Sequence, residues 1–419
     1  MTGDLDVGAL REALRDVARR HESLRTVFPD HDGVPYQHIL DDLPELTVLD
    51  SAADLGELAR YRFDLTTEPP LRATLCTGDG EHLLMLLLHH IAGDGWSMRP
   101  LSTDLVTAYT ARTAGHAPNW TPLPVQYADY TLWQRDLLGD PDDPGSLFHE
   151  QTGYWTRTLD GLPDTIDLPF DRPRPAAASY RGDALIFRFG GDLCGRLSRL
   201  AADCQVSLFM VLQAGLAALL SRLGAGTDIP IGAPIAGRTD DSLNDLIGFF
   251  VNTLVLRNDV SGDPSFRDLL ARVRETDLAA YAHQDVPFEH LVEVLNPARS
   301  TGYQPLFQVA LALQNAPGMT FDLPRLSIAQ LPVFANVARF DLMVSVRPDP
   351  APDGNGRDLL GFIEYNTDVF DRDGIDAVAQ RWHLLLQAVA EDPGRPISDI
   401  ELLSDQERRR LLLDWSIGG

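Results

Sequence analysis

The sequence predicts a mixed α/β protein built from two lobes. The chain has 419 residues, which exceeds the usual limit for one hydrophobic core, and its apolar content of 44% permits sizeable cores. Stretches with helical and with strand periodicity alternate through both halves. A Pro- and Asp-rich stretch, DGLPDTIDLPFDRPRP at residues 160–175, breaks helices and lacks ladder donors. We therefore expect one lobe over residues 1–172 and a second over residues 173–402.

The first half predicts the order helix, strand, loop, helix. Asp6 is expected to cap a helix whose apolar residues recur at helical spacing, namely Val7, Leu10, Leu14 and Val17. Residues 81–91, EHLLMLLLHHI, predict a buried strand, because the apolar run is short and a turn follows it at residues 93–95. A helix over residues 100–113 comes next, with Gly115 as its stop.

The second half predicts a similar mixture. Ser207 is expected to cap an apolar helix that continues to Leu223 and stops at Gly224. Further helices are expected over residues 265–282 and 373–390. Strands are expected over residues 183–189, 228–237, 306–314 and 359–365.

The composition excludes several classes of function. The formal net charge of -26 argues against nucleic acid or an anionic membrane as a partner, since both favour a basic face. All 35 basic residues are Arg, so a Schiff-base lysine and a P-loop lysine are both excluded.

The remaining composition predicts a protein of the reducing cytoplasm. Cys76, Cys194 and Cys204 are scattered and odd in number, so neither a disulfide framework nor a zinc site is indicated. The opening residues lack a signal-peptide pattern, and no uninterrupted apolar run reaches membrane-spanning length. We expect no membrane association and no metal site.

The strongest candidate for a functional site is HHIAGDG, residues 89–95, where a strand gives way to a loop. Adjacent strand residues point to opposite faces, so His89 and His90 are expected to do different jobs, one facing a tunnel and the other anchoring the sheet. The glycines allow a tight turn or a close substrate approach, and Asp94 can orient a neighbour or pair with an Arg. Two satisfied core histidines beside an ordinary turn would explain the same motif in an arbitrary protein.

Six segments in this order resemble the condensation domains of nonribosomal peptide synthetases. They resemble the family's second to seventh motifs in turn: RHESLRTVF (residues 20–28), HHIAGDGWS (89–97), YADYTLW (127–133), IGFFVNTLVLR (247–257), HQDVPFE (283–289) and RSTGYQPLFQ (299–308, in which Arg299, Pro305, Leu306 and Phe307 carry the likeness). The resemblance covers essentially the whole chain. The tail at residues 403–419 resembles the linker that leads into an adenylation domain. Packing alone explains most of these segments as scaffold.

The resemblance implies two chloramphenicol-acetyltransferase-like lobes arranged in a V, with the active site at their interface. It implies an acyltransferase of secondary-metabolite or antibiotic biosynthesis that joins two carrier-bound groups through an amide bond. The domain would bind no cofactor of its own, since both substrates arrive on 4'-phosphopantetheine. Its partners would be an upstream donor carrier protein, a downstream acceptor carrier protein and an adjacent adenylation domain.

The resemblance also gives the site residues their roles. His90 would position or deprotonate the acceptor amine, and Gly95 would lend a backbone donor near the reacting groups. His89 and Asp94 would be structural, with Arg238 as the partner of Asp94. Trp96, Ser97 and Asn252 would support the site, although Asn252 could equally be a structural amide, because a buried amide needs a partner or a substrate to bond.

Related subtypes leave alternatives open. The segments HHIAGDGWSM, PLSTDL, LQNAP and ARFDL are most similar to the subtype that takes an L-configured donor and an L-configured acceptor. Cyclisation domains replace both histidines with aspartates and fit poorly. Epimerisation domains share HHxxxDG, but Ser97 after Trp96 and the fifth motif, IGFFVNTLVLR, favour condensation. A release-type or dehydrating variant stays open.

A non-catalytic docking platform that recruits a tailoring enzyme is the alternative from another class of function. The intact residues His89, His90, Asp94 and Gly95 argue against it. Members of the family normally open with an SxAQxRLW-like segment and a strand, and Met1 begins just after that point. The start is then a boundary of the given piece, a misplaced start codon or a real truncation, and only a real truncation would leave the first lobe without this strand and with a sheet edge unpaired.

Overall fold

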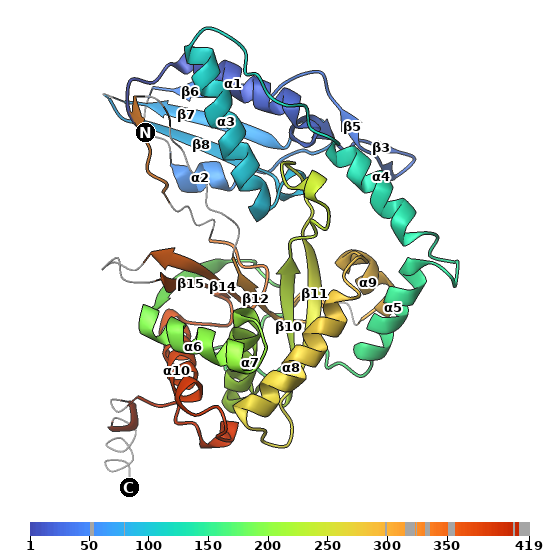
Figure 1. The fold of residues 1–419 in the computed structure, drawn as a ribbon, viewed down its shortest axis with the longest axis vertical. Helices are drawn as coiled ribbons and strands as arrows, with labels where there is room; N and C mark the ends of the chain where they lie inside the picture. The colour runs from blue at the N-terminus through green and yellow to red at the C-terminus, as the bar shows by residue number, and fades with distance from the viewer. Residues whose placement is uncertain are drawn as a thin grey trace. The chain divides into compact units, whose positions relative to one another are not determined.

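A computed structural model describes residues 1–50, 54–78, 80–297, 300–314, 323, 325–331, 336–350, 357–404 and 407–409. Its contacts divide the chain into two compact units (Figure 1). Unit 1 comprises residues 1–140, 236–251 and 316–335, and unit 2 comprises residues 141–235, 252–315 and 336–419. Arg299 of the predicted seventh motif and most of the tail at 403–419 lie outside the described residues.

Unit 1 has a three-stranded sheet, ordered β6-β7-β8, together with helices and several two-residue strands. β6 pairs parallel to β7, and β7 pairs antiparallel to β8. The helices are α1 (Val7–Arg20), α2 (Leu55–Ala59), α3 (Met98–Thr113) and α4 (Tyr127–Leu138), and the strands are β1 (Thr2–Gly3), β2 (Thr26–Val27), β3 (Asp30–His31), β4 (Val34–Pro35), β5 (His38–Ile39), β6 (Leu46–Leu49), β7 (Leu71–Thr77), β8 (His82–Leu88) and β13 (Leu326–Ser327).

The core of unit 1 lies between the sheet and the helix pair α1 and α3. Asp6 caps α1 as predicted, because its Oδ1 accepts a hydrogen bond from Ala9 N at 2.9 Å. The apolar residues of α1 that recur at helical spacing, such as Leu10, Leu14 and Val17, are buried in one cluster with residues of α3, β6 and β7. This layer supports the loop that follows β8.

Unit 2 has a six-stranded mixed sheet, ordered β11-β10-β12-β14-β15-β9. The pairs β10–β12 and β12–β14 are parallel, and the others are antiparallel. The strands are β9 (Gly182–Phe189), β10 (Asp228–Ile235), β11 (Asn252–Asp259), β12 (Val309–Leu313), β14 (Leu342–Pro350) and β15 (Arg357–Asn366), and the helices are α5 (Leu147–Thr158), α6 (Gly191–Asp203), α7 (Leu208–Leu220), α8 (Phe266–Tyr281), α9 (Phe288–Leu295) and α10 (Arg372–Glu391).

Helix α7 is the central helix of unit 2. Ser207 caps it through Met210 N at 3.2 Å, and Gly224, with φ of 102°, ends the π-helical turn (Ser221–Ala225) that follows. Residues 208–225 have the length and composition of a membrane span, although Gln213 and Arg222 interrupt the apolar run, and 67% of this stretch is buried inside the protein. The helix is apolar on all sides because it is enclosed by the sheet and by α6, α8 and α10.

The predicted elements are largely confirmed. The predicted helices correspond to α1, α3, α7, α8 and α10, and the predicted strands to β8, β9, β10, β12 and β15. β8 is half-buried along its whole length rather than buried. Strand β14 and helix α6 have no counterpart in the prediction, since proline interrupts the first and glycines the second.

Residues 141–172, which the sequence analysis assigns to the first lobe, belong to unit 2. The reason is α5, whose Trp155 is 2% exposed and packs with Leu254, Leu256 and Phe307. The Pro- and Asp-rich stretch continues this packing, because Ile166 and Leu168 join the core under α7. Residues 236–251 connect β10 to β11 of unit 2 but belong to unit 1. We call residues 236–251 the crossing segment.

Candidate functional site in unit 1

The two histidines of the motif follow β8, which ends at Leu88, so neither lies in the strand as the prediction assumed. His89 caps a short 3-10 turn (His90–Ala92), and its Nδ1 accepts a hydrogen bond from Ile91 N at 3.1 Å. His89 is half-buried, whereas His90 is exposed. The two side chains therefore have different environments. The cause is their place in the turn after β8, not alternation along a strand.

Asp94 is the buried centre of the loop. Its side chain is 0% exposed, and it caps a second 3-10 turn (Gly95–Ser97) that leads into α3. Asp94 Oδ1 accepts hydrogen bonds from Ser97 N at 2.9 Å and from Ser97 Oγ at 3.0 Å. Asp94 Oδ2 accepts from Phe250 N at 3.0 Å. The Asp94 carboxylate thus stabilises the loop from within and also attaches it to the crossing segment.

Arg238 supplies the positive charge beside Asp94. Its Nη2 lies 3.4 Å from Asp94 Oδ1 and donates to Ser97 Oγ at 3.1 Å, while Nη1 donates to the carbonyls of Leu243 and Leu246. The guanidinium stacks over the ring of Phe250, 4.1 Å from its centroid. Burial lowers the pKa of Arg238, and the neighbouring carboxylate of Asp94 opposes this shift. A buried charge pair of this kind is costly to break.

Ser97 joins the histidine loop to the crossing segment a second time. Its Oγ lies 2.9 Å from Gly248 O and accepts a hydrogen bond from Gly248 N at 3.2 Å. Ser97 is fully buried, and Trp96 beside it is half-buried. Gly248 has no room for a side chain, since an added Cβ would lie 2.3 Å from Tyr127 Cδ2.

Other predicted motifs also hold the crossing segment. Tyr127 of the fourth motif donates its hydroxyl hydrogen to Phe249 O at 2.7 Å. Ser23 of the second motif donates from Oγ to Ile247 O at 2.7 Å. The second, third and fourth motifs therefore meet on the beginning of the fifth, which explains them as one scaffold rather than as separate sites.

A buried histidine–carboxylate pair that the sequence did not indicate also contacts the crossing segment. His21 is 1% exposed, and its Nε2 lies 2.7 Å from Asp104 Oδ2. His21 Nδ1 accepts from Ile247 N at 3.4 Å, so Nε2 carries the hydrogen that Asp104 accepts. Burial lowers the pKa of His21, and Asp104 acts in the other direction. Asp104 lies on α3, 84 positions from Arg20 and 83 from His21. The spacing of these residues in the sequence therefore gave no sign that they pair.

Asn252 is the one predicted site residue that belongs to unit 2. It begins β11, so the preceding residues Phe249 and Phe250 are not in the strand. Asn252 Nδ2 donates to the carbonyls of Gln284 and Val286, both at 2.8 Å. Its Oδ1 accepts from the backbone nitrogens of Thr253 and Phe288 at 2.8 and 3.0 Å. Every hydrogen-bonding group of this amide is used, which accounts for the residue without a substrate contact.

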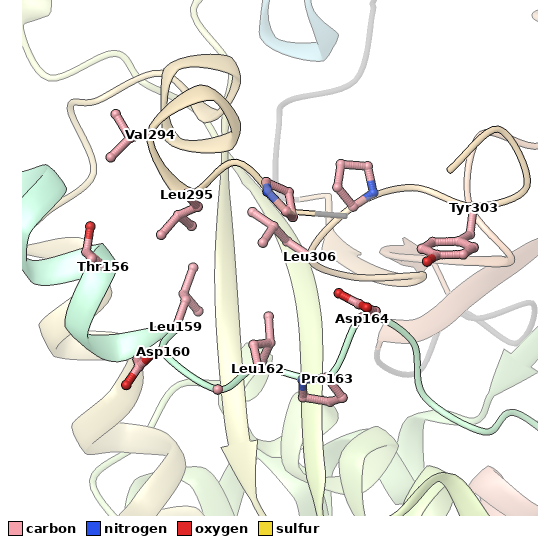
Figure 2. Close-up of a pocket in the computed structure, with 13 residues that line it drawn as sticks. Thr156, Leu159, Asp160, Leu162, Pro163, Asp164, Val294, Leu295, Tyr303 and Leu306 are labelled. Atoms are coloured by element: carbon pink, nitrogen blue, oxygen red, sulfur yellow. The ribbon is translucent and has the colours of Figure 1, made fainter. Parts of the chain in front are cut away.

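Unit 2 contains a pocket of about 300 Å³ that no predicted site residue lines (Figure 2). Its walls come from the end of α5 and the loop after it, from the end of α9, and from residues 303–306. Leu159, Leu162, Leu295 and Leu306 form its apolar side, and Asp160 and Asp164 lie at its edge. None of its lining residues is a histidine, a cysteine or a lysine.

Comparison with known proteins agrees with the resemblance. Residues 1–412 match the family model described as Condensation domain. The chain is 55% identical over 418 residues to the probable non-canonical nonribosomal peptide synthetase CymA of Salinispora arenicola, and 52% identical over 424 residues to a dimodular nonribosomal peptide synthase of Bacillus subtilis. These alignments cover 98% and 99% of this chain but only 5% and 18% of the two relatives, so the chain spans a small part of each.

The fold resembles the X-domain from teicoplanin biosynthesis, with a TM-score of 0.88 at 37% identity over 96% of this chain and 91% of that one. The X-domain has also been solved in a complex with OxyB. Solved condensation domains of lower identity share the same mixed α/β fold, which confirms the predicted fold class. The chain belongs to the condensation-domain family, whose members in nonribosomal peptide synthetases are acyltransferases that form peptide bonds.

Proposed function

We propose that this chain joins a donor acyl or peptidyl group to an acceptor amino group, with both groups carried as thioesters on 4'-phosphopantetheine. The single observation that carries the proposal is the exposed His90 on a loop that buried Asp94 and Arg238 fix in place. The proposed partners are an upstream donor carrier protein, a downstream acceptor carrier protein and an adenylation domain, all acting in the cytoplasm. We also propose the subtype that takes an L-configured donor and an L-configured acceptor.

The proposed reaction is attack of the acceptor nitrogen on the donor thioester carbonyl. The C–N bond forms, the C–S bond breaks, and the nitrogen loses a proton while the released thiolate gains one. An α-amino group has a reference pKa near 7.7 to 8.0, so part of it is protonated at neutral pH and cannot attack. His90 would accept a hydrogen bond from the neutral amine or take up its proton.

The roles of the remaining residues follow from their positions. Gly95 is exposed and begins a 3-10 turn, where a backbone N–H has no partner within the turn and can reach a developing oxyanion. Asp94, Arg238 and Ser97 would act by holding the loop, and His89 by anchoring it. Holding both reactants in line is worth effective molarities of roughly 10⁵ M or more, against about 10² to 10⁴-fold for a general base. Positioning is therefore the larger proposed contribution.

The test is condensation between a donor loaded on one carrier protein and an amino acid loaded on a second, followed by intact-protein mass spectrometry. The expected product is a longer thioester on the acceptor carrier. His90→Ala is expected to lower the rate by about 10² to 10⁴-fold without loss of folded protein, because the side chain is exposed. Full activity in His90→Ala would contradict the role proposed for this residue.

Gly95→Ala is expected to lower turnover while leaving the stability of the protein unchanged. A Cβ at this position would meet no atom within 4 Å, so the free energy of unfolding should change by less than about 0.5 kcal/mol. The methyl group would occupy the proposed approach of the substrate, and turnover should fall. Gly248→Ala is the matched control, because its Cβ would clash with Tyr127 and should cost about 1 to 3 kcal/mol in urea denaturation. A Gly95→Ala variant with unchanged stability and unchanged turnover would remove Gly95 from the proposed site.

A second candidate function is a docking platform for a tailoring enzyme. The likeness to the X-domain, which has been solved with OxyB, favours it. The same assay distinguishes the two functions. No product from folded protein across several donors would favour the platform, whereas product that depends on His90 would exclude a purely non-catalytic role.

A further inference from the structure

His90 lacks the usual orienting group of a working histidine. A carboxylate or carbonyl normally binds one ring nitrogen and so fixes the ring orientation. Within the part of the chain that the structure describes, neither ring nitrogen of His90 has a hydrogen-bond partner. The ring instead meets the ring of Phe249 edge to face, with 5.0 Å between centroids and 86° between planes. This arrangement is a favourable geometry for an aromatic pair.

Phe249 is held in place by its neighbours in the chain. Its own carbonyl accepts the Tyr127 hydroxyl hydrogen bond at 2.7 Å. On one side, Gly248 binds Ser97 Oγ, and on the other, Phe250 N donates to Asp94 Oδ2 at 3.0 Å. Asp94 and Ser97 belong to the same loop as His90, so the two rings are fixed to one hydrogen-bonded frame. The backbone that carries the Phe249 ring is therefore held independently of His90.

We propose that Phe249 is a positioning residue, which fixes the ring orientation of His90 through the edge-to-face contact and leaves both imidazole nitrogens available. The inference rests on the proposed function of His90 and adds a residue to it. An aromatic contact suits this task because it restricts rotation of the ring without occupying a nitrogen. The mechanism requires one nitrogen to face the acceptor amine, and a freely rotating ring would present it only part of the time.

The first test compares Phe249→Leu with Phe249→Tyr in the two-carrier condensation assay. Leu removes the aromatic ring but keeps an apolar side chain, and kcat should fall roughly two- to tenfold, the range that an aromatic contact supplies. KM for either loaded carrier should stay within twofold, because the residue acts through His90 rather than on the carriers. Phe249→Tyr keeps the ring and should restore kcat.

A matched control lies in the same unit. Phe63 meets His89 edge to face at 5.7 Å and 83°, and His89 already has a hydrogen bond at Nδ1. Phe63→Leu should therefore leave kcat within twofold. Equal losses in Phe63→Leu and Phe249→Leu would indicate a general effect on the loop and would overturn the proposal.

The second test does not depend on activity. The Cε1 proton of His90, assigned by comparison with His90→Ala, should shift in the NMR spectrum of Phe249→Leu, because the ring current of Phe249 is lost. The Tyr variant should keep the wild-type shift. An unchanged resonance in Phe249→Leu would show that the contact does not exist in solution and would overturn the inference. If the shift changes as expected but the wild-type protein forms no product, the contact stands and the proposed function fails.

Discussion

Between pH 4 and pH 7 the protein is expected to lose about 4 kcal/mol of unfolding free energy through Asp277 alone. Asp277 lies on α8, is 0% exposed, and accepts a hydrogen bond from Gln213 Nε2 at 2.9 Å. Its Oδ2 is buried and has no partner among the described residues. Burial raises the pKa of Asp277 from 3.8 to about 7, and the Gln213 hydrogen bond offsets only part of this.

The direction of this pH effect on stability follows from the protonation of Asp277 in the folded and in the unfolded protein. Below pH 4 the carboxyl group is protonated in both the folded and the unfolded protein, so it has no effect on stability. Between the two pKa values the unfolded chain releases the proton and the folded protein retains it, so stability falls by about 1.4 kcal/mol per pH unit over about three units. Above pH 7 both states are ionised, and the loss stays constant.

Urea denaturation of Asp277→Asn and of the wild type from pH 4 to pH 9 measures this effect. The variant cannot ionise, so its stability advantage should grow between pH 4 and pH 7 and then level off. Glu275→Gln, on an exposed position of the same helix, is the matched control and should show no such trend. A constant difference between Asp277→Asn and the wild type across this range would show that Asp277 titrates normally.

Asp94→Ala is expected to destabilise unit 1 by about 3 to 5 kcal/mol. The variant leaves the buried guanidinium of Arg238 without its counter-charge, and it removes the acceptor of Phe250 N. The histidine loop and the crossing segment lose their shared attachment, so activity should fall with stability. Urea denaturation and the condensation assay, measured on the same preparation, check both expectations.

The Arg238→Met change provides the control for this prediction. A double variant, Asp94→Ala with Arg238→Met, removes both charges and should be less destabilised than Asp94→Ala, since no unpaired charge remains buried. His90→Ala should lose activity and keep its stability, because His90 is exposed. If Asp94→Ala is as stable as the wild type, the pair does not hold the loop.

Local signals predicted much of the fold, because caps and stops act within a few residues. Asp6 and Ser207 cap helices where the sequence places them, and Gly224 takes the left-handed conformation expected of a stop. The predicted lobe for residues 141–172 differs from the unit to which they belong. The reason is that proline and aspartate indicate only where regular structure is interrupted. They do not report which core the segment joins, and here Trp155 decides that through contacts more than 75 residues away in sequence.

The sequence predicted most residues of the candidate site but not the contacts that hold them in place. The motif HHIAGDG indicated His89, His90, Asp94 and Gly95, and the family resemblance indicated Arg238. Phe249 and His21 lie in segments that carry the resemblance, but neither was indicated as a site residue, since their roles depend on contacts with residues far away in sequence, His90 for Phe249 and Asp104 for His21. The even choice for Asn252 could not be decided from sequence, because its partners, in the loop before α9 and at the start of α9, lie more than 30 positions away.

The crossing segment has a consequence for protein engineering. It leaves the sheet of unit 2 after Ile235 and returns at Asn252, two residues that pair across adjacent strands. A chimera with its crossover near residue 172 would give the histidine loop a crossing segment from a different parent. Such a hybrid would inherit Asp94 from one parent and Arg238, Gly248 and Phe250 from the other. Compatible recombination therefore requires exchanging residues 236–251 together with the first half of the chain.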